Sequence, residues 1–188
     1  MHKSSYITSF STKQMDVYYI CEEMANDFQK YLVKNKARLA PFEPLRTPEY
    51  YELEEVKKRI QSAVNAQKGR KGVSLVFIPK GSSNIVGNVN FTNFVFGVFQ
   101  ACHLGFSIDI DFEGKGVMRE VLIESLNHIR NKYQLHRVMA NHLPTNERCE
   151  CLLQRVGFIK EGYAKSYLKI NGAWQDHVLN SFVFEDSL

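Results

Sequence analysis

The chain has 188 residues, 44% of them hydrophobic and 23% charged, which are ordinary values for one globular domain with a real core. Its formal net charge of +4 at pH 7 fits a polyanionic cofactor or a ribosomal setting, although charge alone favours neither. No apolar run is long enough to span a bilayer, and the first residues do not resemble a signal peptide. We therefore expect a single domain over residues 1–188, cytoplasmic, with neither membrane nor DNA as a partner.

The cysteine pattern argues against a metal site. Cys21, Cys102, Cys149 and Cys151 form no C-x-x-C pair, so zinc is not expected and no other metal is indicated. Reduced thiols are expected in a cytoplasmic protein.

The first forty residues predict a short edge strand followed by a helix. Residues 6–10 suit the strand, and residues 14–36 carry apolar side chains at helical spacing. We interpret this stripe as core: Val17, Ile20, Cys21, Met24, Phe28, Tyr31 and Leu32.

Residues 40–48 contain three prolines and cannot be the interior of a helix. An ordered loop anchored by Phe42 and Leu45 is the simple interpretation. A second helix is predicted from residue 49 to about residue 67, ending at the basic turn that begins with Gly69.

Two strands are predicted over residues 73–78 and 85–96, joined by a polar loop over 79–84. Four phenylalanines lie in or just after the second strand: Phe91, Phe94, Phe96 and Phe99. A stacking platform for RNA bases is conceivable. Sheet core is the favoured interpretation, because no RRM-like signature accompanies these aromatics.

The stretch 103–129 predicts a strand, a glycine turn and a helix. Apolar residues alternate up to Ile110, Gly114 and Gly116 follow, and apolar residues then recur every three or four positions. A glycine turn at a helix start exposes backbone N–H groups at the positive end of the helix dipole, which makes an anion site possible. Because Val117 follows Gly116 and Arg119 replaces a third glycine, the turn is neither a P-loop nor a dinucleotide fingerprint.

The last third predicts a buried strand over 137–141, a helix from about 147 to 156 and a final hairpin turning at Asn171-Gly172. The strand–helix–strand unit implies a parallel, right-handed crossover. With the antiparallel hairpins around it, the expected fold class is α/β (α+β), with one mixed, largely antiparallel central sheet flanked by helices.

Two motifs resemble the GNAT N-acetyltransferases. The run Asp111-Phe112-Glu113-Gly114-Lys115-Gly116 is similar to their acyl-CoA pyrophosphate loop, and Asn146-Glu147-Arg148-Cys149 with the later Gly157-Phe158 is similar to their second motif. The chain after about residue 38 resembles the RimJ-like branch in further segments: 40–46, 136–141, 162–165 and 171–178. For the proline-containing loop over 40–48 the resemblance implies a second interpretation, one wall of the acceptor site. Asp111 and Leu153 depart from the family, which often has Gln or Arg at the first position and a proton-donating tyrosine at the second.

The resemblance implies acetyl-CoA as co-substrate and assigns residues to it. The backbone of Glu113, Gly114, Lys115, Gly116, Val117 and Met118 would hold the pyrophosphate. The strand edge at Phe106, Ser107 and Ile108 would pair with the pantetheine arm, much as an added strand does. Asn146 would bond the cofactor, or only cap the helix that follows it.

The resemblance also suggests two catalytic candidates. A peptide α-amino group has a pKa of about 8, so roughly a tenth is neutral at pH 7 and only a modest base is needed. Glu161 matches a glutamate proposed as base in related enzymes; the alternative is an ion-pair partner. Cys149 could protonate the leaving thiolate or carry the acetyl group, but a small packing residue is the favoured interpretation.

The implied function is acetylation of the N-terminal alanine of a small-subunit ribosomal protein by direct attack. Partners would be that protein or the assembling ribosome. Two alternatives stay open: acetylation of a small amine or antibiotic on the same scaffold, and a ribosome-assembly binding protein in which acetylation is incidental.

Overall fold

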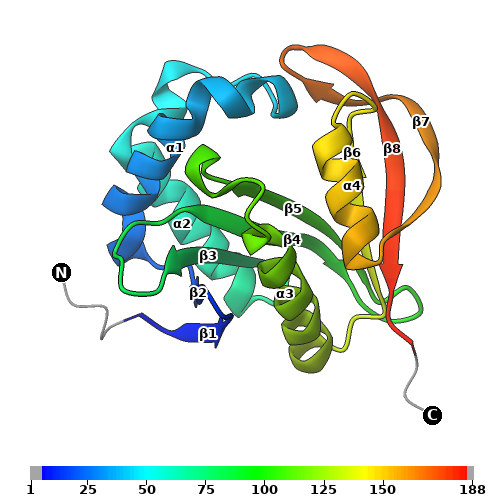
Figure 1. The fold of residues 1–188 in the computed structure, drawn as a ribbon, viewed down its shortest axis with the longest axis horizontal. Coiled ribbons are helices and arrows are strands. Elements are labelled where there is room, and N and C mark those ends of the chain that lie inside the picture. Colours follow the sequence, from blue (N-terminus) through cyan, green and yellow to red (C-terminus); the bar gives the residue numbers. More distant parts are fainter. Residues whose placement is uncertain (1–5, 186–188) are drawn as a thin grey trace.

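A computed structural model of the protein describes residues 6–185 and contains one eight-stranded sheet (Figure 1). The spatial order is β1-β2-β3-β4-β5-β6-β8-β7, with β5 and β6 parallel and every other neighbouring pair antiparallel. The strands are β1 (Thr8–Ser11), β2 (Met15–Tyr19), β3 (Val73–Pro79), β4 (Gly87–Val95), β5 (Ala101–Ile108), β6 (Arg137–His142), β7 (Ile159–Ile170) and β8 (Ala173–Val183). This arrangement confirms the predicted mixed, largely antiparallel sheet.

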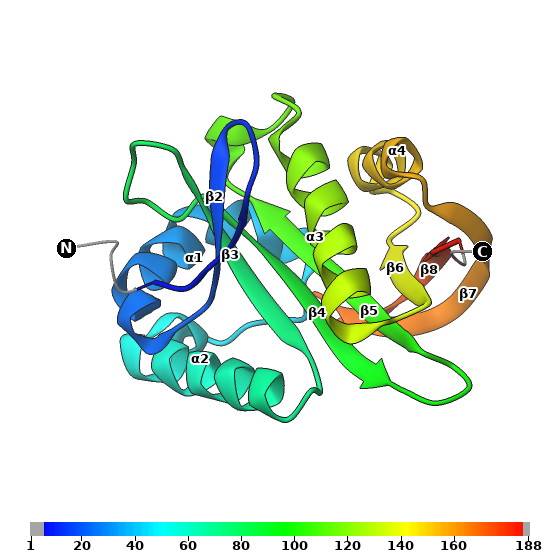
Figure 2. The same ribbon diagram turned by 90° about the horizontal axis from the view of Figure 1, so that it is seen from below.

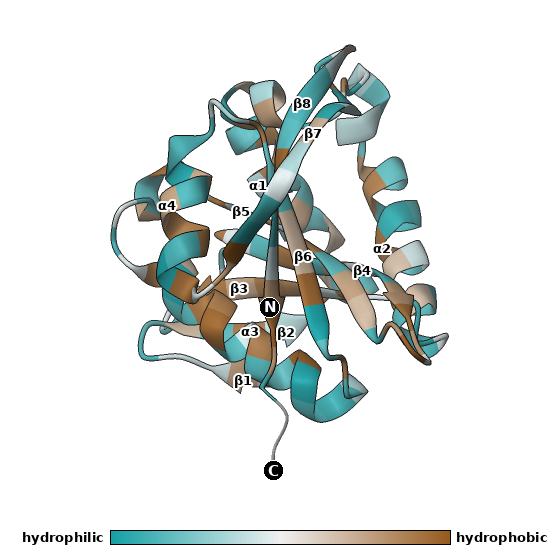
Figure 3. Cartoon of the chain, turned by 90° about the vertical axis from the view of Figure 1, so that its right-hand side faces the viewer, coloured by the Kyte–Doolittle hydropathy of each residue, from teal (hydrophilic) through white to brown (hydrophobic). Residues whose placement is uncertain are grey.

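The α-helices cover both faces of the sheet, as the view from below shows (Figure 2). They are α1 (Ala25–Leu39), α2 (Leu53–Lys68), α3 (Val117–Tyr133) and α4 (Glu147–Val156). Short 3-10 turns occupy Glu22–Met24, Ala40–Phe42, Pro48–Tyr51 and Ile110–Phe112. Along each helix hydrophobic residues alternate with hydrophilic ones (Figure 3), as expected for helices that bury one side.

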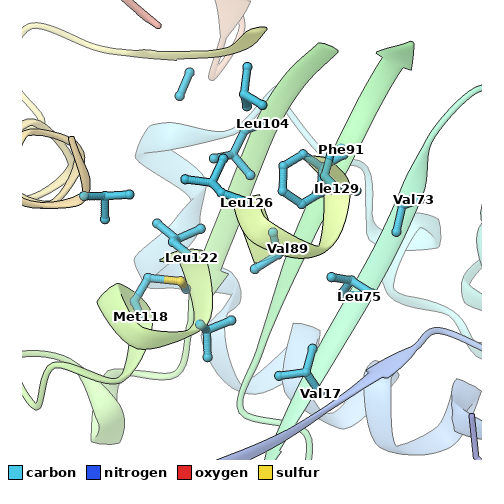
Figure 4. Close-up of a cluster of buried hydrophobic side chains, with 14 of the residues drawn as sticks. Val17, Val73, Leu75, Val89, Phe91, Leu104, Met118, Leu122, Leu126 and Ile129 are labelled. Atoms are coloured by element: carbon cyan, nitrogen blue, oxygen red, sulfur yellow. The ribbon is translucent and has the colours of Figure 1, made fainter. Parts of the chain in front are cut away.

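Two apolar cores result, one on each face. The core under α3 and α4 contains Val17, Leu75 and Phe91 from the strands and Leu122 and Ile129 from α3 (Figure 4). The second core lies between the sheet and the pair α1 and α2. Because β3 is covered on both faces, its side chains are nearly all buried, and the sequence shows a continuous apolar run there.

The predicted crossover is confirmed: β5, the glycine turn, α3 and β6 follow one another, and β6 lies parallel to β5. The final hairpin is also confirmed. Asn171 and Gly172 have φ of 45° and 84°, the left-handed conformation that a tight two-residue turn requires.

The predicted helix over 14–36 is wrong in its first third. Met15–Tyr19 forms β2, which pairs with β1 and β3, and the α-helix begins only at Ala25. The physical reason is that β2 is buried on both faces: Val17 packs in the core under α3, and Tyr18 packs in the core under α1. A strand buried on both faces shows no alternation of apolar and polar residues. The apolar residues of β2 therefore looked continuous with the apolar face of the helix that follows.

Three smaller predictions also need correction. The second helix starts at Leu53, after a 3-10 turn, and not at residue 49. Phe42 and Leu45 do not anchor their loop, since they are 44% and 68% exposed. Of the four phenylalanines, Phe91 lies in the core. Phe96 and Phe99 are exposed, because they lie on the β4–β5 connection outside the sheet.

The described part of the chain has four free cysteines. No helix within residues 6–185 combines the length and the apolar character that crossing a membrane requires.

Candidate active site

The principal cavity opens where β5 and β6 separate. These parallel strands pair only over three residues each, ending at His103 and Met139. From Leu104 to Ile108, β5 keeps its ladder with β4 but has no partner on the β6 side. A cavity of about 1090 Å³ fills the gap, bounded by the end of α1, the unpaired half of β5, the glycine turn, the end of β6 and α4. Unpaired backbone groups of a strand therefore line a cavity that can take a long ligand.

The glycine turn forms one end of this cavity. Gly114 and Gly116 have φ of 70° and 76°, and no protein atom lies within 4 Å of where a Cβ would be at either position. The turn leads directly into α3 at Val117, so the free N–H groups of the helix start border the cavity. This open, positively polarised end fits a pyrophosphate.

Asp109, a buried carboxylate, caps the 3-10 turn Ile110–Phe112 that leads into the glycine turn. Burial alone would raise the pKa of Asp109, but hydrogen bonds from Lys34, the Asp111 amide and Asn35 outweigh it and lower the pKa. Because Lys34 and Asn35 belong to α1, this cluster holds α1 against the turn.

Arginines surround the cavity and favour an anionic ligand. Arg38, Arg119, Arg148 and Arg155 all line it. The Glu113 carboxylate joins two of them, 2.5 Å from Arg38 Nη1 and 2.6 Å from Arg148 Nη1. Glu113 thereby links α1 to α4 across the cavity, and the arginines outnumber the carboxylates that pair with them here.

Nine of the ten predicted cofactor residues line this one cavity: Phe106, Ser107, Ile108, Glu113, Gly114, Gly116, Val117, Met118 and Asn146. Lys115 does not; its ammonium lies 5.6 Å from the centre of the Phe112 ring. Asn146 also caps α4, because its Oδ1 accepts from the Cys149 N–H at 3.2 Å.

Cys149 lines the cavity, but its chemistry is restrained by its surroundings. Burial raises the pKa of the Cys149 thiol to about 12, so the thiol is protonated at neutral pH. Burial thus disfavours the thiolate form, and a small packing residue fits the site better than a nucleophile. Leu153, at the family's tyrosine position, is buried in the core under α4.

Glu161 is not brought together with the other predicted site residues. It is exposed on β7, and both carboxylate oxygens lie 2.8 Å from Arg137 Nη1. Hydrogen bonding to Arg137 lowers the pKa of Glu161, which makes it a weaker base. Arg137 begins β6, whereas the cavity is at the other end of that strand. The geometry fits the ion-pair interpretation.

The end of α1 and the loop after it also line the cavity, through Leu39 and Phe42. The Asn171 N–H at the tip of the β7–β8 hairpin donates to Glu43 O at 2.9 Å, so the hairpin holds this loop in place. His177 of β8 also lines the cavity, and its ring lies 5.6 Å from that of Tyr167. One cavity thus reaches from the glycine turn to a half-exposed wall where an acceptor can enter.

Sequence reasoning missed His142, the last residue of β6. It is 3% exposed and lines the cavity, and its Nδ1 donates to Leu143 O at 2.9 Å. Its Nε2 is buried and has no hydrogen-bond partner within the described residues. The only feature of the sequence that could have pointed to His142 is its place immediately after the predicted strand over 137–141, at the end of a strand.

A split strand pair with a glycine turn at a helix start is the arrangement that the resemblance to acyl-CoA-dependent N-acetyltransferases predicts. Comparison with known proteins agrees: residues 20–159 match the model of the acetyltransferase (GNAT) domain. The chain belongs to the GNAT acetyltransferase family and is an acyltransferase enzyme.

One curated relative and one solved structure place it within the family, and a second solved structure shares its fold. The chain is 37% identical over 156 residues to the ribosomal protein uS5-alanine N-acetyltransferase of Escherichia coli K12, covering 83% of this chain and 80% of that protein. The structure of ribosomal-protein-S5-alanine acetyltransferase from Vibrio fischeri matches with a TM-score of 0.90 and 34% identity, over 96% of this chain and 98% of that one. A Mycobacterium smegmatis RimJ in complex with CoA-disulfide shares the fold, with a TM-score of 0.85 and 22% identity. The match covers 90% of this chain and 81% of that one.

Proposed function

We propose that this enzyme transfers the acetyl group of acetyl-CoA to the α-amino group of the N-terminal alanine of a small-subunit ribosomal protein. The observation that carries the proposal is the single cavity that joins the glycine turn to the wall formed by Phe42 and His177. The specificity for alanine and for a ribosomal protein is supported by the 37% identity to the Escherichia coli uS5-alanine enzyme. We also propose that residues 1–188 act as one domain, because all described strands form one sheet and the helices pack on it.

In this proposal the cofactor residues are the nine that line the cavity, together with the backbone of Lys115. The amides at Glu113–Met118 bind the pyrophosphate, with Lys115 contributing its backbone and not its side chain. The edge of β5 at Phe106, Ser107 and Ile108, which has no partner strand on the β6 side, pairs with the pantetheine arm, although the Ile108 carbonyl already accepts from Arg38 Nη2. Asn146 contributes through its cap of α4, which orients the helix start beside the cavity.

The acceptor is an amine that reaches the thioester from the side of Phe42. Acetyl-CoA supplies an activated acyl group, and the protein orients the two reactants. Because about a tenth of an N-terminal α-amino group is neutral at pH 7, the enzyme can select it over a lysine, whose pKa is about 10.4. Direct attack is favoured over an acetyl-cysteine, since the Cys149 thiol is protonated.

Short peptides test this proposal. Turnover with acetyl-CoA is measured on a peptide that starts with alanine, on the same peptide with its α-amino group blocked, and on one with a lysine but no free α-amino group. The proposal predicts turnover only of the first peptide. Equal turnover of the lysine peptide would refute N-terminal specificity, and turnover of small amines alone would support the antibiotic-type alternative.

A further inference from the structure

We propose that Asp176 and Tyr167 are positioning residues for the acceptor. A bulge in β7, held by Asp176, packs Tyr167 against His177, and His177 contacts the amino-terminal end of the acceptor. The inference deepens the proposed function and rests on it for the nature of the acceptor. The placement of His177 does not depend on that assignment.

The bulge lies between two regular parts of the β7–β8 hairpin. On one side of it Ala164 pairs with His177. On the other side Leu168 pairs with Gln175, so three residues of β7 lie opposite a single residue of β8. The middle one of the three, Ser166, has a φ of 47°, a left-handed conformation that residues other than glycine adopt rarely. Bulges beside active sites commonly redirect a side chain.

The residue of β8 opposite the bulge is Asp176, and its carboxylate binds β7 at two points. Oδ1 accepts the Ser166 N–H at 2.8 Å, and Oδ2 accepts the Tyr163 hydroxyl at 2.7 Å. These two hydrogen bonds lower the pKa of Asp176, so the carboxylate is ionised at neutral pH. The left-handed conformation at Ser166 therefore has a local cause, which is the charged side chain that its N–H meets.

Tyr167 directly follows the left-handed residue and contacts two side chains of the cavity. Its ring centre lies 5.6 Å from that of His177, and its hydroxyl accepts from Asn141 Nδ2 at 3.4 Å. Asn141 and His177 line the cavity, whereas Asp176 and Tyr167 do not. Asp176 and Tyr167 can therefore act on a ligand only through the residues that they hold in place.

The strand register places His177 on the face of the sheet opposite to α3 and α4. Val138 and Ala140 of β6 pack in the core under α3 and α4, so Asn141 points to the other face. Asn141 pairs with Leu179, and alternation along β8 puts His177 on the same face as Leu179.

The cavity reaches both faces of the sheet through the gap between β5 and β6. The glycine turn and α4 line it on one face, and Leu39 and Phe42, at and just after the end of α1, line it on the other. A cofactor held by the glycine turn and α4 leaves the α1 side for the acceptor. His177 is on that side.

The ring of His177 is suited to an amino group. The Gln175 carbonyl can only accept, so the hydrogen of the neutral ring is on Nδ1, 3.0 Å from that oxygen. Nε2 then carries a lone pair, and no residue of the described chain bonds to it. Unlike His142 Nε2, this atom is not fully buried. An N–H of the acceptor is the partner that such a nitrogen takes.

Steady-state kinetics on an alanine-starting peptide test the inference. Asp176→Ala removes both bonds to β7 and should raise the KM for the peptide by about tenfold or more, because hydrogen bonds to a charged group are lost. Asp176→Asn keeps an oxygen for the Ser166 N–H and should recover most of that loss. Tyr167→Leu, which leaves the bulge in place, should also raise the KM for the peptide. Calorimetry should give each variant the acetyl-CoA Kd of the parent.

A double variant shows whether Asp176 acts through His177. His177→Asn keeps an N–H donor for the Gln175 carbonyl but lacks Nε2, so it should raise the KM for the peptide by itself. Asp176→Ala should then add little in the His177→Asn background, because the two changes remove one function. Full additivity of the two effects would overturn the inference.

The matched control is Asp16→Ala. Asp16 is also a strand carboxylate that accepts a hydrogen bond, from Ser11 Oγ at 2.9 Å across the β1–β2 pair, but it does not line the cavity. This variant should keep the parent KM for the peptide. If Asp176→Ala also keeps it, or loses kcat alone in proportion to its folded fraction, the carboxylate only stabilises the hairpin and the inference is overturned.

A second readout does not need the acceptor. In ¹H–¹³C spectra, with the His177 ring signals assigned from His177→Asn, these signals should shift in Asp176→Ala and in Tyr167→Leu but not in Asp16→Ala, because the neighbouring tyrosine ring is displaced or lost. Unchanged signals in Asp176→Ala would overturn the inference. The expected shifts in an enzyme that does not turn over the peptide would refute the proposed acceptor and still support the positioning of His177.

Discussion

The Cys149 thiol lies in the wall of the cavity, half-buried, beside the residue that caps α4. Its raised pKa, about 12, reflects loss of solvent around a charge that no neighbour stabilises. The sequence could give the motif and hence the position, but not the burial that decides its chemistry.

Cys149→Ala is predicted to keep turnover within about tenfold of the parent, since loss of a general acid would cost about a hundredfold or more. Cys149→Ser should lie closer still. The measurement is kcat on an alanine-starting peptide, with intact mass after acetyl-CoA alone. A stable acetyl adduct that disappears when peptide is added would contradict direct transfer. Within the same protein, exposed Cys151 should alkylate faster than Cys149.

Glu161 shows that a motif match at a single residue does not establish that residue's role. The resemblance placed it as a base, and that assignment stays a prediction that its position does not support. Sequence alone could not show that Arg137, 24 residues earlier, would hold both of its oxygens.

If Glu161 is an ion-pair partner, Glu161→Gln should reduce turnover equally and only slightly at pH 7 and pH 9. The lowered pKa means that the pair stabilises the fold above the carboxylate's unfolded pKa and that this contribution is lost as pH falls through the folded pKa. Because the pair is exposed, the loss should be under about 1 kcal/mol. Arg137→Gln is the matched variant and should lower Tm by a similar amount. A much larger loss of turnover at pH 7 than at pH 9 would restore the base role.

Among the elements, the strand–turn–helix from β5 to α3 was predictable because local rules agree there. Alternation gives the strand, two glycines give the left-handed turn, and the three-to-four spacing gives the helix. β2 was not predictable in the same way, because its burial on both faces comes from packing against α1 and α3, which are distant in the sequence. The loop after α1 was also misjudged, since the contact that holds it, from Asn171 to Glu43, is made by a hairpin more than a hundred residues later.

Acetyl-CoA should raise the free energy of unfolding by about 2.7 kcal/mol at a hundredfold excess over its dissociation constant. Gly116→Val and Gly114→Val should abolish that gain, because a side chain blocks the approach of the pyrophosphate to the amides. Each variant also pays backbone strain of about 1–2 kcal/mol, since φ is positive.

Gly81→Val is the matched control for this experiment. Its φ is 78°, and no atom lies within 4 Å of its would-be Cβ, but Gly81 is on the β3–β4 loop and away from the cavity. It should lose comparable intrinsic stability and keep the full acetyl-CoA shift. Calorimetric binding by both turn variants at parent affinity would show that the glycine turn does not hold the pyrophosphate.

For the whole molecule, the decisive feature is that the pairing between β5 and β6 ends after three residue pairs. β5 and β6 are held together at one end by three residue pairs and held apart at the other, where α1, the glycine turn and α4 meet around the opening. Sequence periodicity identifies both strands but not the residue at which their pairing ends. The fold class was therefore predictable, whereas His142 emerged only once the opened gap was seen.

The central claim concerns the acceptor, and intact-mass analysis tests it most directly. Purified, unmodified small-subunit ribosomal proteins are incubated with the enzyme and acetyl-CoA, and each product is fragmented to locate new acetyl groups. The account predicts one acetyl group on the α-amino nitrogen of a protein that begins with alanine, with Gly116→Val as the inactive reference. Acetylation confined to lysine side chains, or no acetylation by an enzyme that still binds acetyl-CoA, would contradict it.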